Sequence, residues 1–306
     1  MQYVEASGLR VSRIGLGAWQ FGSREWGYGD TYLAETAPAL VRRAIELGIT
    51  MVDTAEAYGP GRSERTIGAV LADLAPEVRA TLTIATKFMP IAPLEPILER
   101  QARGSLRRLG GTSLDLYYAH FPNPFVSAGR VMQSLRPLVQ AGVVRRVGVS
   151  NYSLAAWQAA EAALGAPVVA NQVRFSLIAP RAAASLVPWA ATHDRLVVAY
   201  SPVGQGLLAR DPATATVRGV RSLDFGHARR LGARIVPLAA ELRDVARAHG
   251  ATPAQVALAW VLHHPSTVAI PGARTVAQLE ENAAAADLVL APDDVERLTA
   301  AAAAAT

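Results

Sequence analysis

The segment Leu82-Thr-Ile-Ala-Thr-Lys-Phe88 is a short apolar run that ends in a charged residue, and it lies between two amphipathic stretches at about 63–74 and 94–109. A run of this length between helical patterns is typical of a buried strand in an α/β protein. The same pattern recurs along the chain. Candidate strands are Ile14–Ala18, Met51–Asp53, Leu82–Thr86, Asp115–His120, Val147–Val149, Val168–Asn171, Leu196–Tyr200 and Val268–Ile270.

Helical patterns follow every candidate strand. They cover about 33–48, 63–74, 94–109, 130–141, 154–164, 181–193, 237–249 with 253–263, and 275–285. Strands that alternate with helices predict a parallel sheet, and a count of eight favours a closed (β/α)8 TIM barrel over an open doubly wound sheet. The segment Gly15-Leu-Gly17-Ala-Trp-Gln20 lacks the third glycine of a GxGxxG phosphate fingerprint, which agrees with the barrel.

The chain shows no linker, so we expect residues 1–306 to form one barrel domain. Ser7-Gly8 between two short strand patterns predicts a β-hairpin at 1–13. A long connection at 201–234 follows the seventh strand, and long connections in compact domains are usually functional or disordered. The alanine-rich end at 300–306 is either the end of a helix or disordered.

Composition excludes several classes of function. The chain has no cysteine, which rules out disulfides, thiolate catalysis and cysteine-bearing zinc sites. The net charge of +5 is spread along the sequence without a basic stripe, so we expect no nucleic-acid partner, although a mild positive field favours a polyphosphate-bearing cofactor. Glu5 and Arg10 precede any apolar stretch, and the longest apolar run is Val256–Leu262. We therefore expect a cytoplasmic protein with neither a signal peptide nor a membrane partner.

Polar residues stand where the candidate strands end, which is where barrels carry their chemistry. Lys87 is the only lysine beside twenty-nine arginines. Arginine does not replace a compact ammonium that must sit beside a titrating group. Asp53, Tyr58 and His120 follow or close neighbouring strands. Each alone could be a structural polar group, and the lone lysine could reflect arginine-favouring codon usage, but their convergence indicates one site.

The chemistry that these four side chains suggest is proton delivery. A free phenol has a pKa of about 10, and an adjacent ammonium lowers that pKa by stabilising the phenolate. A carboxylate beside the ammonium keeps it charged, and a histidine can orient a carbonyl oxygen or help pass the proton. The set holds no good nucleophile, metal cluster or spaced carboxylate pair, and it lacks an electron source. A hydride-donating cofactor would have to supply the electrons.

Ordered motifs along the chain resemble those of the aldo-keto reductase family, in particular its bacterial members. They are Asp53-Thr-Ala-Glu-Ala-Tyr58-Gly59, Ala85-Thr-Lys87, Asp115-Leu-Tyr-Tyr-Ala-His120-Phe-Pro122, Gly148-Val-Ser150-Asn151, Asn171-Gln172, Tyr200 through Leu207, and Ile270 through Asn282. The resemblance runs from about residue 8 to 286. It implies a (β/α)8 barrel that binds NADP(H) and reduces aldehydes or ketones, with a small-molecule carbonyl as its substrate.

The resemblance also implies a role for each matching residue. Tyr58 would be the general acid, tuned by Lys87 and Asp53, and His120 would orient the carbonyl. The implied cofactor contacts are Gly17, Ala18, Trp19, Asp53, Ser150, Asn151, Gln172, Tyr200, Ser201, Pro202, Gly204, Gly206, Leu207, Gly272, Arg274, Gln278, Glu281 and Asn282. The implied substrate pocket is Trp19, Trp26, Phe88, His120 and Phe121. No metal is expected.

Two features depart from many family members. Gly272 and Gln278 stand where those members carry lysine and arginine, which leaves Arg274 as the evident cation for the 2′-phosphate. A single bidentate arginine can suffice, so we expect NADPH/NADP⁺ with use of NADH also possible. The chain is similar as well to the potassium-channel β-subunits that resemble reductases, so a cofactor-binding regulatory subunit is an alternative. A barrel hydrolase or isomerase is a third, and the oligomeric state, the substrate and the preferred direction stay open.

Overall fold

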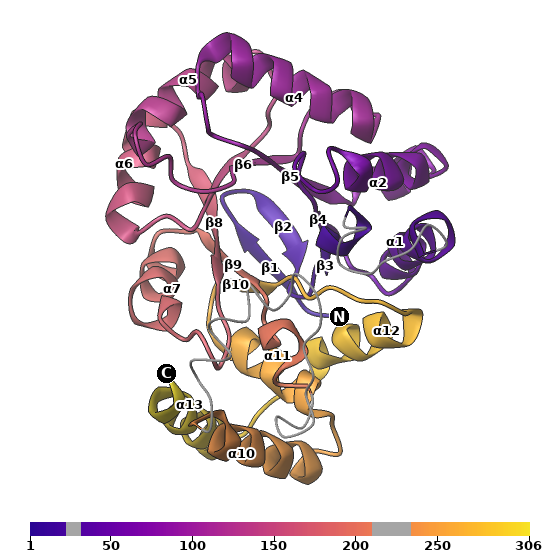
Figure 1. Cartoon of the computed structure of the whole chain (residues 1–306), viewed down its shortest axis with the longest axis vertical. Helices are drawn as coiled ribbons and strands as arrows, with labels where there is room; N and C mark the ends of the chain where they lie inside the picture. The colour runs from indigo at the N-terminus through magenta and orange to yellow at the C-terminus, as the bar shows by residue number, and fades with distance from the viewer. Residues whose placement is uncertain (23–31, 210–233) are drawn as a thin grey trace.

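The computed structural model of the chain describes residues 1–22, 32–209 and 234–306, and its centre is a barrel of parallel strands (Figure 1). The eight strands of the barrel lie side by side in chain order, from β3 to β10. They are β3 (Leu16–Gly17), β4 (Met51–Asp53), β5 (Thr83–Phe88), β6 (Leu116–Ala119), β7 (Val147–Ser150), β8 (Val168–Arg174), β9 (Leu196–Tyr200) and β10 (Thr267–Ala269).

The seam between the first and last strands closes the ring. Ile14 pairs with Ala269 in a parallel bridge, and the Gly15 amide donates to the Ala269 carbonyl at 2.8 Å. Beyond the bridge, the Gly17 amide donates to the Pro271 carbonyl at 3.0 Å. The predicted (β/α)8 barrel is therefore confirmed, with a first strand shorter than the predicted Ile14–Ala18.

Helices surround the strands on the outside of the barrel (Figure 1). They are α1 (Ala37–Glu46), α2 (Arg62–Ala72), α3 (Pro76–Ala80), α4 (Glu95–Leu109), α5 (Ala128–Gln140), α6 (Leu154–Leu164), α7 (Ala182–Thr192), α10 (Ile235–Ala248), α11 (Pro253–His263), α12 (Val276–Ala284) and α13 (Pro292–Ala305). Shorter elements are the 3-10 helices η1 (Trp19–Phe21), η4 (Gly204–Gly206) and η6 (Ala285–Asp287) and the π-helix η3 (Tyr32–Thr36). The alanine-rich end is thus the last part of α13, where Ala302 and Ala305 are buried.

Local sequence signals place the helix ends. Ser127, Ser153, Thr252 and Thr275 each accept a hydrogen bond from the backbone amide three residues on, which starts α5, α6, α11 and α12. Gly110 and Gly165 end α4 and α6 in the left-handed conformation, which glycine adopts without a Cβ penalty.

The strands divide the core into an interior and an outer layer. In β5, Ala85 packs inside the barrel, whereas Ile84 and Phe88 pack between the strands and the helices. This is the period of two that a strand imposes on its side chains. Lys87 therefore shares the inward face with Ala85, and its neighbours Thr86 and Phe88 face the helices.

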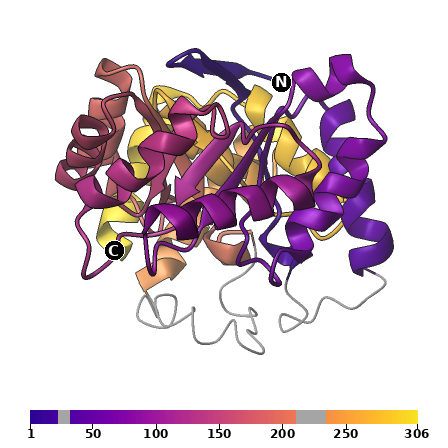
Figure 2. The ribbon, with the colours of Figure 1, turned by 90° about the horizontal axis from the view of Figure 1, so that it is seen from above.

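A hairpin closes the amino end of the barrel, as the sequence predicts (Figure 2). It consists of β1 (Tyr3–Ala6) and β2 (Leu9–Ser12), joined by Ser7 and Gly8 with φ of 50° and 66°. The side chains of Ala6, Leu9 and Val11 pack against the interior layer of the barrel. They fill the interior of the barrel at the amino ends of the strands, so the site lies at the carboxyl ends.

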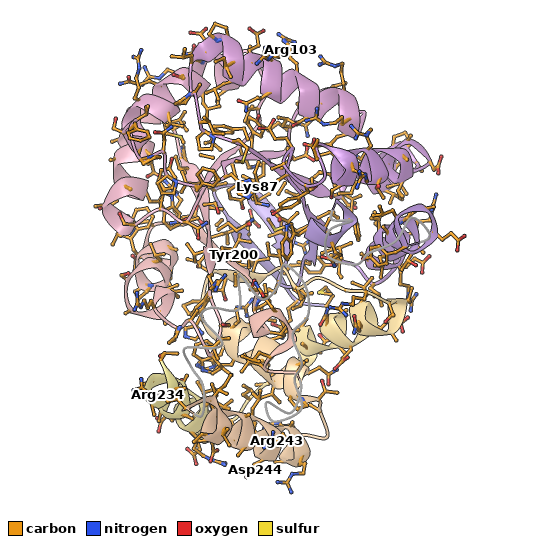
Figure 3. All side chains as sticks on the ribbon, viewed as in Figure 1. Lys87, Arg103, Tyr200, Arg234, Arg243 and Asp244 are labelled. Carbon is orange, nitrogen blue, oxygen red and sulfur yellow. The ribbon has the colours of Figure 1, made fainter. Side chains whose placement is uncertain are left out.

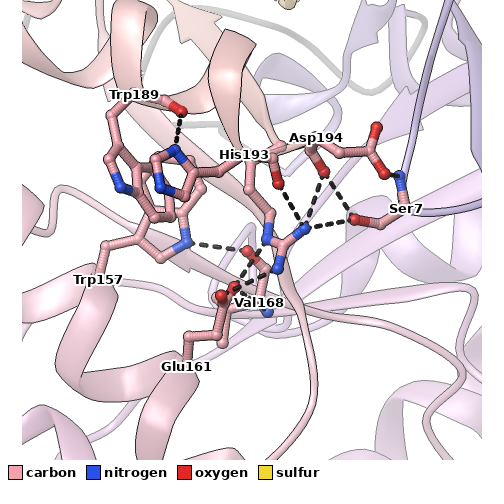
Figure 4. Close-up of polar contacts among 8 residues, drawn as sticks. Ser7, Trp157, Glu161, Val168, Trp189, His193 and Asp194 are labelled. Atoms are coloured by element: carbon pink, nitrogen blue, oxygen red, sulfur yellow. Dashed lines mark hydrogen bonds and ion pairs between the residues drawn. The ribbon is translucent and has the colours of Figure 1, made fainter.

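Hydrogen bonds fix this hairpin to the segment before β9, and an ion pair holds that segment to α6 (Figure 4). The Ser7 amide and hydroxyl donate to Asp194 at 2.8 Å and 2.7 Å. Arg195 donates to the Ser7 hydroxyl at 2.8 Å and pairs with both carboxylate oxygens of Glu161 on α6, at 2.7 Å and 2.9 Å. This cluster lies at the end of the barrel away from the predicted site.

Candidate active site

A cavity of about 630 Å³ opens at the carboxyl ends of the strands. Its wall contains, among others, Gly17, Trp19, Asp53, Tyr58, His120, Phe121, Ser150, Asn151, Gln172, Tyr200, Ser201, Pro202, Gly206, Gly272, Arg274, Gln278, Glu281 and Asn282. The structure thus brings residues from nearly every strand end into one concave space, which is where α/β barrels place their sites.

Lys87 lies near the centre of the barrel (Figure 3), fully buried behind two residues of the cavity wall, Asp53 and Tyr58. Its ammonium donates to Asp53 Oδ2 at 2.6 Å, to the Thr54 carbonyl at 2.8 Å and to the Tyr58 hydroxyl at 3.1 Å. All three ammonium protons therefore have acceptors from β4 and the loop that follows it. The predicted cluster of Asp53, Tyr58 and Lys87 exists as one hydrogen-bonded unit.

The ion pair at the base of the cavity is almost completely enclosed. The side chains of Lys87 and Asp53 are 1% and 4% exposed. Burial disfavours the ammonium, but the charge of Asp53 and the contact with Tyr58 outweigh it, so the pKa of Lys87 is raised. Gln172 donates to the other oxygen of Asp53 at 2.7 Å, which holds the carboxylate from β8 as well.

Tyr58 departs from the expectation of an acidic phenol. Burial raises the pKa of Tyr58 above its usual value, and the charge of Lys87 opposes this rise without cancelling it. Lys87 lowers the pKa of the phenol, as the sequence analysis expects, but burial raises that pKa by more. The phenol is consequently protonated at neutral pH, which is the state that a proton donor requires.

His120 is held neutral next to Tyr58. Burial, and then the charge of Lys87, lower the pKa of the imidazole to about 3. Its ring meets the Tyr58 ring edge-on at a centroid separation of 5.8 Å. Nδ1 is buried and has no hydrogen-bond partner among the described residues. A neutral imidazole can donate one hydrogen bond to an oxygen atom without competing for the proton of the phenol.

Polar groups on β7, β8 and β9 form the next part of the wall. Tyr200 donates its hydroxyl to Asn151 Oδ1 at 3.0 Å, and Asn151 donates to the Ser150 hydroxyl at 3.2 Å. Asn151, Ser201 and Gln205 have positive φ values of 61°, 51° and 58°. Backbone strain of this kind concentrates at functional sites, where the surrounding structure maintains it.

The far end of the cavity lies at the start of α12. The Gln278 side chain accepts a hydrogen bond from the Arg274 amide at 2.9 Å. Glu281 accepts from the Thr252 hydroxyl at 2.6 Å, and Asn282 donates to the Gly272 carbonyl at 3.4 Å. A Cβ on Gly272 would lie 2.5 Å from the amide end of the Gln20 side chain, so a larger residue there would require Gln20 to move. A helix start beside an arginine is a favourable place for an anionic group.

Some predicted residues lie elsewhere. Phe88 is fully buried and packs on Tyr117 at a centroid separation of 5.0 Å, so its placement in the substrate pocket is wrong. It follows Lys87 on the strand and therefore faces the helices. Ala18, Gly204 and Leu207 stand beside the cavity without forming its wall. Trp26 and residues 210–233 of the long connection fall outside the described residues.

The cavity wall also contains residues that sequence reasoning missed. They are Arg174, Ala209 and Ala254, whereas Gln20 and the motif residues Val203, Gln205, Ile270 and Pro271, which also line it, stand in segments that the sequence analysis had singled out. Arg174 could have been found from strand geometry, because it is two residues beyond Gln172 and so shares its face. Its guanidinium carbon lies 5.9 Å from the centre of the Tyr200 ring.

Two further findings concern the described part of the chain. No cluster of three or more His, Cys, Asp or Glu side chains there is arranged to hold a metal ion. No helix in the same ranges has the length and apolar character needed to cross a membrane.

The molecule thus combines an eight-stranded α/β barrel with a hydrogen-bonded unit of Asp53, Lys87 and Tyr58 beside a neutral His120. Together these features define an oxidoreductase built on a (β/α)8 barrel. The chain belongs to the aldo/keto reductase family, whose model matches residues 13–303. An uncharacterized oxidoreductase of Mycobacterium tuberculosis is 48% identical over 304 residues, which cover 99% of this chain and 93% of the relative.

Two more distant relatives carry more specific names. Methylglyoxal reductase YeaE of Escherichia coli is 31% identical over 294 residues, 95% of this chain and 90% of the relative. The crystal structure of an aldo-keto reductase from Klebsiella pneumoniae in complex with NADPH has a TM-score of 0.77 at 28% identity, and the match covers 97% of this chain and 94% of that one.

Proposed function

We propose that this enzyme reduces aldehydes or ketones to alcohols with NADPH, and that Tyr58 supplies the proton. The observation that carries the proposal is the Tyr58 hydroxyl 3.1 Å from the Lys87 ammonium, at the base of a cavity that also contains His120. A protonated phenol beside a fixed positive charge is suited to deliver a proton as an oxygen atom gains negative charge.

The residues of the cavity fit an extended dinucleotide. Tyr200 offers a planar ring whose hydroxyl is fixed to Asn151, and Ser150 and Gln172 add polar groups beside it. The start of α12 with Arg274 lies at the other end of the same cavity, where a phosphate would bind. These residues would hold the nicotinamide at one end and the adenosine phosphate at the other, and the Klebsiella structure with NADPH supports that choice.

When bound, the reduced nicotinamide supplies the hydride that adds to the carbonyl carbon. The protein supplies the proton and the orientation. His120 donates a hydrogen bond to the carbonyl oxygen and aligns it with the Tyr58 hydroxyl. Tyr58 then transfers its proton to that oxygen, so hydride and proton together complete the two-electron reduction. Lys87 stabilises the phenolate that remains, and Asp53 keeps the lysine charged and in place.

Aromatic side chains shape the substrate end of the cavity. Trp19 and Phe121 line it and are each 36% exposed. We infer that the substrate is a small-molecule carbonyl with an apolar face. Methylglyoxal heads the panel of trial substrates because the Escherichia coli relative is named for it. The cysteine-free sequence is in keeping with a cytoplasmic enzyme.

The test uses purified protein, NADPH and a panel of aldehydes and ketones. Wild-type protein should oxidise NADPH with at least one of them. Tyr58→Phe should abolish turnover and bind NADPH as tightly as the wild type, because the change removes only the proton donor. Tight binding of NADPH by wild-type protein without turnover of any carbonyl would instead favour a regulatory subunit.

A further inference from the structure

The first turn of α2 contains two polar side chains that are completely buried, Ser63 and Glu64. Neither belongs to the cavity wall. A buried carboxylate is costly unless it is paired and hydrogen-bonded, and an apolar side chain would generally be no less stable there. The contacts of this turn therefore call for an explanation.

Both oxygens of Glu64 are used. The Thr86 hydroxyl donates to one at 2.6 Å, and the Arg108 guanidinium on α4 donates to the other at 2.5 Å. Thr86 immediately precedes Lys87 on β5 and points outward from the barrel. Glu64 is thus hydrogen-bonded to the outer face of β5, at the residue next to the lysine that contacts Tyr58.

Ser63 connects the same turn to β4. The Thr54 hydroxyl donates to the Ser63 hydroxyl at 2.7 Å, which in turn donates to the Ala18 carbonyl at 2.9 Å. Thr54 immediately follows Asp53, and its carbonyl accepts a hydrogen bond from Lys87. The turn therefore contacts the chain neighbours of both members of the buried ion pair.

Tyr58 joins the same turn through a short loop. The Ser63 amide donates to the Tyr58 carbonyl at 3.3 Å, and the Gly61 amide donates to the Glu56 carbonyl at 2.7 Å. Gly59 and Gly61 have φ of 59° and 76°, which allow the chain to turn sharply between Tyr58 and α2. Asp53, Tyr58 and Lys87 are consequently all tied to the first turn of α2.

The path of Arg108 to Glu64 depends on glycines. A Cβ on Gly61 would lie 2.5 Å from the Arg108 side chain, and one on Gly104 would lie 3.1 Å from it. The arginine side chain is 25% exposed, whereas Glu64 is 0% exposed. Because Gly61 and Gly104 have no side chains, there is room beside α2 and α4 for the Arg108 guanidinium to reach the Glu64 carboxylate.

We propose that Glu64, held by Arg108, is a positioning residue that fixes the separation of Tyr58 and Lys87 through its hydrogen bond to Thr86. The proposal rests on the proposed function, because it concerns the same proton transfer. In this view, the ion pair of Glu64 and Arg108 helps to position the catalytic side chains as well as to stabilise the fold. A displacement of about 1 Å at reacting groups can lower turnover about a hundredfold.

The test compares Thr86→Val, which removes the hydroxyl at constant shape, with Thr86→Ser, which keeps it. The matched control is Glu161→Gln, which breaks the ion pair of Glu161 and Arg195 at the other end of the barrel (Figure 4). For each we would measure unfolding, NADPH affinity, kcat for reduction, and the pH profile of kcat for alcohol oxidation, which requires the phenolate.

Thr86→Val should lower kcat about tenfold and move the oxidation profile to higher pH, since a looser Lys87 stabilises the phenolate less. Thr86→Ser should restore both, and Glu161→Gln should unfold more easily yet keep the wild-type kcat and profile. If Thr86→Val does not fold, Glu64→Gln is measured instead with the same expectation. A wild-type kcat and profile in the folded variant would overturn the positioning role. Turnover by Tyr58→Phe would overturn the proposed function itself, so the two failures are distinguishable.

Discussion

Loss of the Lys87 ammonium should destabilise the fold as well as stop the reaction. Lys87→Met leaves the Asp53 carboxylate, 4% exposed, with Gln172 as its remaining side-chain donor among the described residues. Breaking a buried ion pair by removing one partner costs about 3–5 kcal/mol, because an uncompensated charge stays behind. For 306 residues, at roughly 2.1 cal/mol/K of unfolding entropy per residue, this corresponds to a Tm lower by roughly 5–8 °C.

A double variant separates the charge from the packing. Asp53→Asn combined with Lys87→Met removes both charges, so it should recover a large part of the lost stability although it contains one more substitution. Urea unfolding without nucleotide, followed by tryptophan fluorescence, measures both variants. A double variant whose losses simply add would show that the buried charge is not the cause.

The same position tests the argument from the lone lysine. Lys87→Arg keeps the positive charge but introduces a planar guanidinium where a compact ammonium makes three contacts. We expect kcat to fall by a factor of about 10² or more, the range of general acid catalysis. Near wild-type turnover in this variant would refute the reasoning.

Three further predictions concern other parts of the molecule. Arg274→Ala should raise KM for NADPH by about tenfold or more and leave KM for NADH unchanged, as a charged hydrogen bond contributes about 1.5–3 kcal/mol; equal effects in steady-state assays with both cofactors would contradict the 2′-phosphate assignment. The pKa of His120 is about 3 in the folded protein and about 6.5 when unfolded, so the unfolded chain binds more protons between these values. Stability should therefore fall as the pH drops from about 6.5 towards 3, and His120→Gln should flatten that fall in urea titrations at several pH values. Gly148→Ala places a Cβ 2.4 Å from the Tyr118 ring and should cost about 1–3 kcal/mol, a loss that Tyr118→Leu should partly relieve in unfolding experiments.

The strands and the central cluster follow from the sequence because both depend on local patterns. Short apolar runs that end in Asp53, Lys87 and His120 mark the carboxyl ends of strands, and a barrel necessarily gathers those ends. Phe88 shows that a residue next to a site residue in the sequence need not belong to the site. It follows Lys87 in the chain but faces the opposite side of the sheet, so strand alternation decides its place.

Effects that depend on distant partners could not be predicted from the sequence. Glu64 appears there as an ordinary acidic residue of a helix, and its partner Arg108 is forty-four positions away. The direction of the Tyr58 pKa shift likewise depends on how completely the protein encloses the phenol, and no motif encodes this. Charged neighbours can be inferred from a motif, but burial emerges only after the chain has folded.

The seam of the barrel bears on how the chain is made. Ile14 and Gly15 leave the ribosome early, yet their partner across the seam is Ala269. Arg13 likewise cannot form its hydrogen bond to the His264 carbonyl, 2.8 Å long, until His264 has been synthesised. A nascent chain must therefore keep an unpaired strand edge at its start until most of translation is complete, and such edges invite association with other chains. Slower elongation towards the 3′ end of the message should prolong that vulnerable interval.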